Sequence, residues 1–166
     1  QNYSLSKYEV IVVDDNSNDN TEQMLKKYLK KYSNLQVIKN KINRGSGYAR
    51  TLGINQAKGN VLVFTDSDCI LPEDWLKKIA ERFENKDVVC VQGTQECRGK
   101  WGKFMYQGRD AIDFFKSRNI LDTKNLAIRR DLIQKYKFDP QMRYSSDYEL
   151  GQRLSRDVKI HYDSNI

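Results

Sequence analysis

Four short runs of apolar, largely β-branched residues divide the first part of the chain. Each run has the length of a buried strand, and the four lie at 8–13, 35–38, 61–64 and 88–92. The segments between and after them place apolar residues at helical spacing, at 21–32, 45–57 and 72–83. Strands that alternate with helices predict an α/β fold, in which a mostly parallel sheet carries helices on both faces.

The second half of the chain is less regular. Its apolar spacing predicts helices at 101–118, 131–136 and 146–156, and strands at 125–128 and 158–162. No repeat, low-complexity tract or linker interrupts the sequence, so we predict a single domain over residues 1–166. Because the first strand begins only at Tyr8 and the chain stops just past its last strand, we expect a fragment of a longer protein.

Composition and charge narrow the class of protein. The chain is 39% hydrophobic and 31% charged, which indicates a soluble globular domain rather than a disordered chain. Its apolar runs have strand length, far short of the roughly 20 residues that a membrane helix needs. The net charge of +7 favours polyanionic or phosphorylated partners, although lysines along helix-like stretches are also expected on a solvated helix face.

The cysteines give a weak indication of location. Cys69, Cys90 and Cys97 are an odd number at wide spacing, which predicts neither a disulfide framework nor a zinc site. Reduced thiols favour a cytoplasmic protein, and attachment to the cytoplasmic face of a membrane stays an open alternative.

Acidic residues directly follow two of the predicted strands. Asp14-Asp15 comes after the first strand, and Asp66-Ser67-Asp68 comes after the third. Ligands of open α/β sheets bind outside the carboxyl ends of the strands, so these loops are expected to share one crevice. Clustered carboxylates are costly unless a cation neutralises them, and oxygen ligands suit a hard cation. We therefore predict a Mg²⁺ or Mn²⁺ site at Asp66 and Asp68; a turn that caps the next helix would explain only one of the two.

These motifs together resemble family 2 glycosyltransferases of the GT-A fold. The resemblance starts with Val12-Val13-Asp14-Asp15-Asn16-Ser17 and Thr65-Asp66-Ser67-Asp68, and it continues in order through 43–53, 125–130 and 147–154. It covers nearly the whole chain. The resemblance implies an enzyme that transfers a sugar from a nucleotide-diphosphate-sugar donor to an acceptor hydroxyl with inversion, assisted by Mn²⁺ or Mg²⁺. The family's usual first strand and the helix after it are missing from this chain.

The resemblance assigns a donor site residue by residue. It implies that Asp14 and Asp15 contact the base and ribose of the nucleotide, and that Arg50 contacts the nucleotide or its phosphates. It also implies that Asp68 ligates the metal directly, while Asp66 holds the ribose or a metal-bound water. The alternative interpretations are an Asx-turn loop for the first pair and a surface salt bridge for Arg50.

The resemblance also assigns the acceptor side. Asp147 matches the family's general base, although the glutamate that usually precedes it is Ser146 here. Asn125 is expected to line the acceptor or sugar pocket, and Glu149 to bind the acceptor or orient the site. The alternatives are that Asp147 caps the helix that follows it and that Glu149 pairs with an arginine.

Other candidate residues have structural interpretations that we prefer. Five aromatic side chains could stack on a sugar, but their helical spacing favours a place in the core: Trp101, Phe104, Tyr106, Phe114 and Phe115. His161, the only histidine, lies in a predicted strand, and we expect a structural role for it.

Partners and rival functions follow from the same considerations. The resemblance implies a UDP-sugar as donor, with GDP or dTDP as alternatives, and an acceptor that is a saccharide, a lipid-linked molecule or another hydroxyl. It implies no nucleic-acid partner, and it allows peripheral association with a membrane.

A metal-dependent nucleotidyltransferase stays open, because its Gly-rich phosphate loop would follow a first strand that this chain does not show. A phosphatase of the D-x-D type is disfavoured, because it would carry that motif after its first strand, whereas here the motif follows at least two strands. A basic nucleic-acid-binding module would suit the charge, but no helix-turn-helix, zinc or stacking signature is present.

Overall fold

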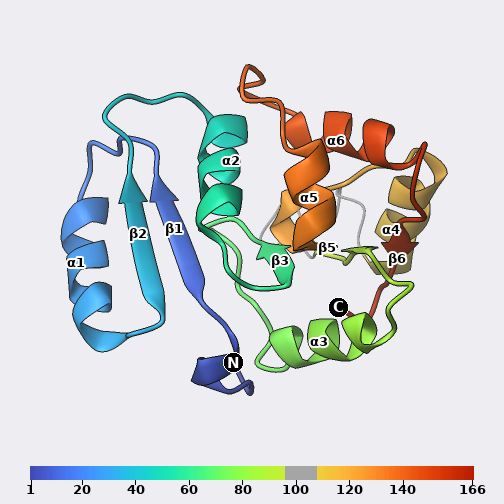
Figure 1. The fold of residues 1–166 in the computed structure, drawn as a ribbon, viewed down its shortest axis with the longest axis horizontal. Coiled ribbons are helices and arrows are strands. Elements are labelled where there is room, and N and C mark those ends of the chain that lie inside the picture. Colours follow the sequence, from blue (N-terminus) through green and yellow to red (C-terminus); the bar gives the residue numbers. More distant parts are fainter. Residues whose placement is uncertain (96–107) are drawn as a thin grey trace.

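The fold comes from a computed structural model of the chain, which describes residues 1–95 and 108–166 (Figure 1). The strands are β1 (Val10–Asp14), β2 (Leu35–Lys39), β3 (Val61–Phe64), β4 (Cys90–Gln92), β5 (Leu126–Arg129) and β6 (His161–Tyr162). The α-helices are α1 (Thr21–Lys31), α2 (Ser46–Gln56), α3 (Trp75–Glu84), α4 (Gly108–Ser117), α5 (Arg130–Tyr136) and α6 (Ser146–Leu154). Two 3₁₀ turns among the described residues are η1 (Leu5–Lys7) and η3 (Thr123–Asn125). Every predicted element therefore has a counterpart, and the helix predicted at 101–118 is described from Gly108 onward.

The described strands form two sheets, where the alternation of elements predicted one. β1 and β2 pair in parallel, from Val10 beside Leu35 to Asp14 beside Lys39. The second sheet has the order β3-β5-β4-β6, in which β5 is antiparallel to both of its neighbours and β4 is parallel to β6. Among the strands of this second sheet β5 alone is reversed, so the sheet is mostly parallel and the predicted α/β class is confirmed.

Contacts other than strand pairing join the two sheets. The α2 helix lies between them, where it packs on β1 and also contacts α5 and α6 (Figure 1). Directly before β1, the Glu9 carboxylate accepts hydrogen bonds from two backbone N–H groups that precede β3, those of Lys58 (2.6 Å) and Gly59 (3.2 Å). The α2 helix thus connects the sheet of β1 and β2 with the helices that cover the second sheet.

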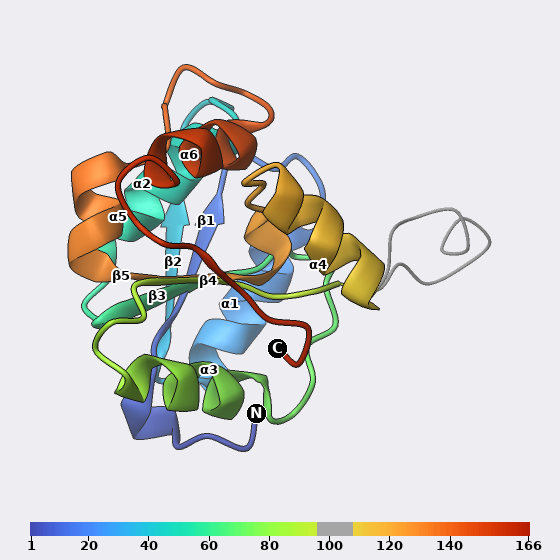
Figure 2. The ribbon, with the colours of Figure 1, turned by 90° about the vertical axis from the view of Figure 1, so that its right-hand side faces the viewer.

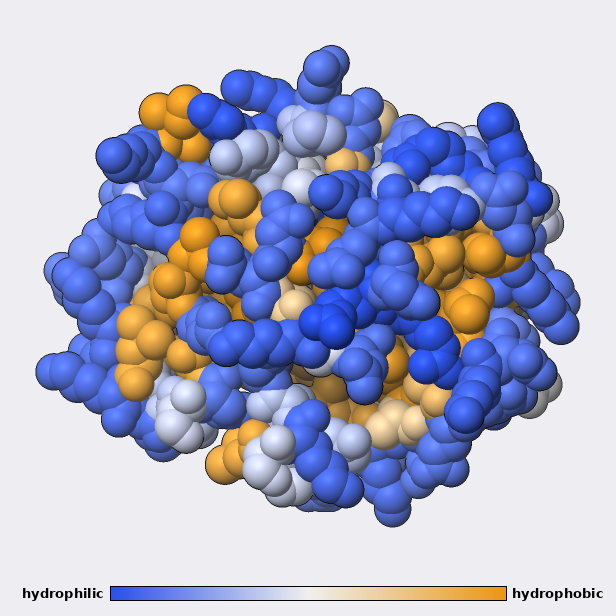
Figure 3. Space-filling model, in the orientation of Figure 1, coloured by the Kyte–Doolittle hydropathy of each residue, from blue (hydrophilic) through white to orange (hydrophobic). Residues whose placement is uncertain are grey.

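The first strand is more exposed than its sequence predicts. A continuous apolar run predicts a buried strand, yet Val10 is 41% exposed and Asp14 is the only buried residue of β1. β1 pairs only with β2, so within the described ranges its other edge has no strand beside it. Figure 3 shows hydrophobic residues emerging between hydrophilic ones on the side where these two strands lie. The run predicted the strand correctly and its burial wrongly.

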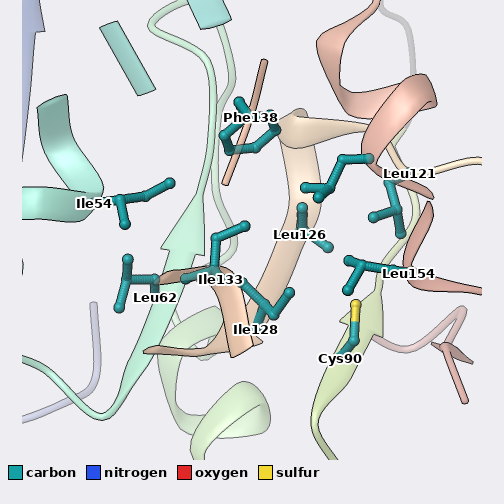
Figure 4. Close-up of a cluster of buried hydrophobic side chains, with 10 residues drawn as sticks. Ile54, Leu62, Cys90, Leu121, Leu126, Ile128, Ile133, Phe138 and Leu154 are labelled. Carbon is teal, nitrogen blue, oxygen red and sulfur yellow. The ribbon is translucent and has the colours of Figure 1, made fainter. Parts of the chain in front are cut away.

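Helices cover both faces of the second sheet, with α3 on one side and α2, α5 and α6 on the other (Figure 2). β5 serves both faces: Leu126 and Ile128 join the larger core cluster, and Ala127 joins the cluster beside α3. This is the alternation expected of a strand. The larger cluster is drawn in Figure 4 and consists of Ile54, Leu62, Cys90, Leu121, Leu126, Ile128, Ile133, Phe138, Leu150 and Leu154.

Two expectations about membranes and thiols can be compared with the structure. In the described ranges, no helix combines the length and the apolar character that crossing a bilayer requires. Cys69 and Cys90 are free thiols, and Cys97 lies outside the described residues. Burial raises the pKa of the Cys90 thiol to about 12, which suits a residue that only packs.

Candidate functional site

The turn after β1 begins with a buried aspartate. Asp14 is 5% exposed, and its carboxylate accepts a hydrogen bond from the Ser17 N–H at 2.8 Å. The next residue but one, Asn16, has a left-handed backbone with φ 67°, which asparagine tolerates better than most residues. Asp14 thus stabilises this turn through a hydrogen bond three residues on, and both the Asx-turn alternative and the contact with a nucleotide stay predictions.

Asp15 ties this turn to the loop that leads into α2. One of its carboxylate oxygens accepts a hydrogen bond from the Asn40 side-chain amide at 2.6 Å. The other accepts from the backbone N–H groups of Arg44 (3.0 Å) and Gly45 (2.6 Å). Asp15 is half-buried, so the carboxylate predicted to bind the nucleotide also holds the start of α2 in place.

Two glycines let the start of α2 approach the segment that leads to α6. Gly45 has φ +90°, a backbone conformation that side chains with a Cβ rarely adopt. A Cβ on Gly47 would lie 2.7 Å from the carbonyl oxygens of both Asp139 and Met142. The α2 N-terminus therefore packs directly on the backbone just before Ser146 and Asp147.

Arg50 links the site across these elements. Its guanidinium lies 3.4 Å from the Asp66 carboxylate and 3.3 Å from the Ser146 hydroxyl, and it packs over the Phe138 ring. Five residues of helix separate Gly45 from Arg50, a rise of about 7.5 Å. The first half of α2 therefore contacts the turn of Asp15 through Gly45 and the turn of Asp66 through Arg50.

The turn after β3 carries the two aspartates predicted to hold a metal. The Asp66 side chain is 35% exposed and pairs with Arg50. Asp68 is exposed, and its carboxylate has no hydrogen bond or ion pair among the described residues. The N-cap residue of α3 is Asp74, so neither aspartate caps that helix. Within the described ranges no group of three or more His, Cys, Asp or Glu side chains could hold an ion, so these residues offer two carboxylates here at most.

Asp147, the predicted general base, lies in the first turn of α6. Its Oδ2 atom accepts hydrogen bonds from the backbone N–H (3.3 Å) and the hydroxyl (3.1 Å) of Thr123, and its Oδ1 atom accepts one from the Tyr148 N–H (3.0 Å). The N-cap residue of α6 is Ser145, so the helix-cap alternative for Asp147 is wrong. The side chain instead bridges from α6 to the η3 turn.

A lysine that sequence reasoning did not single out lies in the same region. The Lys124 ammonium is 3.1 Å from the Asp122 carboxylate. Burial by itself would lower the pKa of Lys124, but the negative charges of Asp122, Asp66 and Asp147 together raise it. The Lys124 ammonium therefore interacts electrostatically with both Asp66 of the predicted metal site and Asp147, the predicted base. Its position next to Asn125 was the available signal, because a cation beside a motif residue is a candidate for charge balance.

Asn125, predicted to face the acceptor or sugar, is a structural centre. It is 8% exposed, and its side-chain oxygen accepts a hydrogen bond from the Trp75 indole N–H at 2.9 Å. Its amide donates to the carbonyl oxygens of Thr94 (2.7 Å) and Ile166 (2.9 Å). These partners occupy the polar atoms of the side chain, and the acceptor role stays a prediction.

Glu149, the other predicted acceptor residue, pairs with Arg153 one turn along α6. The Arg153 guanidinium also donates to the carbonyl oxygens of Tyr136 and Lys137, each at 2.8 Å. The alternative of an arginine pair is confirmed for Glu149. The pair fixes α6 to the end of α5 and so contributes indirectly to the placing of Asp147.

The remaining candidates lie apart from this arrangement or outside the description. Trp101, Phe104 and Tyr106 lie outside the described residues. Phe114 and Phe115 are half-buried neighbours on α4, with ring centroids 6.3 Å apart. His161 is half-buried in β6, opposite Val91 of β4, as a structural role predicts.

Comparison with known proteins identifies relatives over most of the chain. Residues 1–143 match the family described as "Glycosyl transferase family 2". Glycosyltransferase AglE of Haloferax volcanii is 31% identical over 140 residues, which are 81% of this chain and 46% of that protein. The S. aureus TarS 1-349 structure in complex with UDP-GlcNAc has a TM-score of 0.83 at 22% identity, over 100% of this chain and 50% of that one. Mannosyltransferase PcManGT from Pyrobaculum calidifontis, in complex with GDP-Man and Mn²⁺, has a TM-score of 0.78 at 20% identity, over 99% and 48%. The chain thus spans about half the length of these relatives.

Proposed function

Because this chain belongs to glycosyl transferase family 2 and has the GT-A fold, we propose that it transfers a sugar from a nucleotide-diphosphate-sugar donor to an acceptor hydroxyl, with inversion. The observation that carries the proposal is the double contact of Arg50, with Asp66 at 3.4 Å and with Ser146 at 3.3 Å. It brings the turn predicted to hold the donor diphosphate beside the helix that carries the predicted base. A donor and an acceptor could therefore meet beside the first half of α2.

The donor would lie along the first half of α2. Asp15 would contact the base and ribose from the loop that its carboxylate holds in place. Asp14 would stabilise the same turn through its hydrogen bond with the Ser17 N–H. Arg50 would exchange part of its contact with Asp66 for a donor phosphate, and Asp66 would then be free for the ribose or a metal-bound water. UDP is our first choice of nucleotide, because the TarS structure contains UDP-GlcNAc, and GDP is the second, because PcManGT contains GDP-Man.

The residues of the Asp66 turn fit a divalent cation. Asp68 offers an exposed carboxylate without a protein partner among the described residues, and Asp66 offers a second carboxylate two residues away. Mg²⁺ and Mn²⁺ accept such oxygen ligands and fill the rest of their coordination with water and phosphate oxygens. When bound, the ion would supply Lewis-acid stabilisation of the charge on the leaving diphosphate.

Asp147 would serve as the general base. The acceptor hydroxyl would lose its proton to the Asp147 carboxylate while its oxygen forms a bond to the anomeric carbon. In the same step the bond from that carbon to the diphosphate oxygen breaks, and the nucleoside diphosphate leaves with the electron pair. A single displacement of this kind inverts the anomeric configuration and needs no covalent sugar–enzyme intermediate.

The proposal extends to the acceptor and to the location of the protein. The acceptor would offer a hydroxyl of a saccharide, of a lipid-linked molecule or of another compound. The protein would be cytoplasmic and would associate peripherally with a membrane.

A paired substitution tests the function. Asp68→Ala is expected to abolish Mn²⁺-dependent binding of UDP, which isothermal titration calorimetry measures with and without the metal. Asp147→Asn is expected to keep that binding within about twofold and to lower transfer by about 10²-fold or more, the usual contribution of a general base. Normal transfer by Asp147→Asn would remove the base assignment, and UDP binding that ignores both Mn²⁺ and Asp68 would remove the metal site.

A further inference from the structure

A buried threonine from outside the family motifs holds the predicted base. We propose that Thr123 is a positioning residue, which orients the Asp147 carboxylate so that its Oδ1 atom faces the acceptor hydroxyl. The inference rests on the proposed role of Asp147 as general base. It concerns a contact between η3 and α6, whose residues lie 24 positions apart in the chain.

The hydrogen bonds of the carboxylate distinguish its two oxygens. Oδ2 accepts two, from the Thr123 N–H (3.3 Å) and from the Thr123 hydroxyl (3.1 Å). Oδ1 accepts one, from the N–H of the adjacent Tyr148 (3.0 Å). Each carboxylate oxygen has about two lone-pair sites, so Oδ2 is fully used and Oδ1 keeps one site open. Oδ1 is therefore the atom that takes the proton from the acceptor hydroxyl.

The contact is not needed to dock α6 on the rest of the protein. Ser146, Leu150 and Leu154 of this helix are each 0% exposed. A Cβ on Gly151 would lie 2.4 Å from the Asn119 carbonyl oxygen, so the helix backbone already packs tightly at that point. These contacts fix the position of the helix. The hydrogen bond from the Thr123 hydroxyl therefore serves to orient the Asp147 carboxylate.

Thr123 is itself held rigidly, as a positioning residue must be. It is 1% exposed and belongs to the short η3 turn. Gln92 of β4, also 1% exposed, anchors both ends of that turn. Its side-chain oxygen accepts from the Asp122 N–H at 2.8 Å, and its amide donates to the Asn125 carbonyl at 3.1 Å. A chain of contacts thus runs from the sheet through Gln92 and the turn to the Asp147 carboxylate.

The test compares three threonine variants in a transfer assay with a UDP-sugar and its acceptor. Thr123→Val keeps the shape and the backbone hydrogen bond but removes the hydroxyl. We expect kcat to fall about 10- to 100-fold, the range for a lost hydrogen bond to a charged group, while the donor KM stays within about twofold. Thr123→Ser restores the hydroxyl and is expected to recover kcat to within about threefold. Thr94→Val is the matched control, because the Thr94 hydroxyl donates to the Ile166 carbonyl instead (3.4 Å), and its kcat should stay within about twofold.

The outcomes separate this inference from the proposed function. Asp147→Asn is measured alongside: if it transfers sugar normally, the base assignment fails, whatever Thr123 does. If Asp147→Asn is inactive while Thr123→Val has the wild-type kcat, the positioning role of Thr123 is overturned. A fall in kcat that Thr123→Ser does not recover also overturns it. If Thr123→Val does not fold, Thr123→Cys fills the same space with a much weaker donor and carries the same expectations.

Discussion

The guanidinium of Arg50 on α2 lies 3.4 Å from the Asp66 carboxylate at the end of β3. The Arg50 side chain is 19% exposed and the Asp66 side chain 35%, so the pair lies partly shielded from water. A partly buried arginine that pairs with a carboxylate can turn toward an incoming phosphate at little cost, because one charge partner replaces another. The contact therefore suits the proposed role of Arg50 at a donor phosphate.

Replacing Arg50 should weaken nucleotide binding specifically. Arg50→Gln removes the charge and is expected to weaken Mn²⁺-dependent UDP binding by about tenfold or more, the effect of a lost charge-assisted hydrogen bond. Calorimetric titration of UDP measures this. Arg82→Gln is a suitable control, because Arg82 of α3 also pairs with an aspartate, Asp163, outside the proposed site and should leave UDP binding unchanged. Wild-type affinity in Arg50→Gln would show that Arg50 only makes a salt bridge.

Two glycines of α2 should respond in opposite ways to the same substitution. In Gly47→Ala the new Cβ would lie 2.7 Å from two backbone carbonyl oxygens, so the segment 139–142 must move, at a cost of about 1–3 kcal/mol. In Gly53→Ala the new Cβ meets the Val13 methyl at 3.7 Å, an ordinary contact, and the helix gains about 0.5–1 kcal/mol. Denaturant unfolding of both variants measures the difference. Equal stability would mean that the start of α2 is not packed on this segment.

Sequence patterns predicted the elements and the motif residues better than their partners. The aspartates after β1 and β3 could be found because like charges at the ends of strands have a local signature. The link between Asp147 and Thr123 could not, because it joins distant segments and Thr123 belongs to no pattern. The burial of β1 was predicted wrongly for a related reason: an apolar run reports what a strand prefers, while burial depends on which strands and helices come to lie beside it. Asn125 shows a third limit, since a motif residue can be fully used by the fold.

Asn125 should prove essential to stability. Asn125→Ala would leave the Trp75 indole N–H and the Thr94 carbonyl without their buried partner, and we expect a loss of about 2–5 kcal/mol in the free energy of unfolding. Asn34→Ala is the control: Asn34 donates one half-buried hydrogen bond to the Tyr8 carbonyl (3.2 Å), so about 1 kcal/mol or less should be lost. If Asn125→Ala keeps wild-type stability but raises the acceptor KM, the acceptor role predicted from the family resemblance would be favoured instead.

Acid should weaken the protein partly through Glu22 at the start of α1. Hydrogen bonds from Lys26 and Lys39 lower the pKa of Glu22 from 4.5 to about 2. Because the folded-state pKa is the lower one, the ion pairs stabilise the protein above pH 4.5, and this contribution is lost as the pH falls toward 2. Glu22→Gln should therefore have a lower Tm than the wild type at pH 7, and the difference should vanish near pH 2. The side chains of Glu22 and its two lysine partners are exposed, so the difference in Tm should be small and should shrink further in high salt.

The control for this prediction is Glu81→Gln, which breaks a longer ion pair, with Lys77 at 4.0 Å, and should change the Tm less at pH 7. A Tm difference for Glu22→Gln that is the same at both pH values would contradict the prediction, because the lost interaction would then not depend on the charge of the carboxylate.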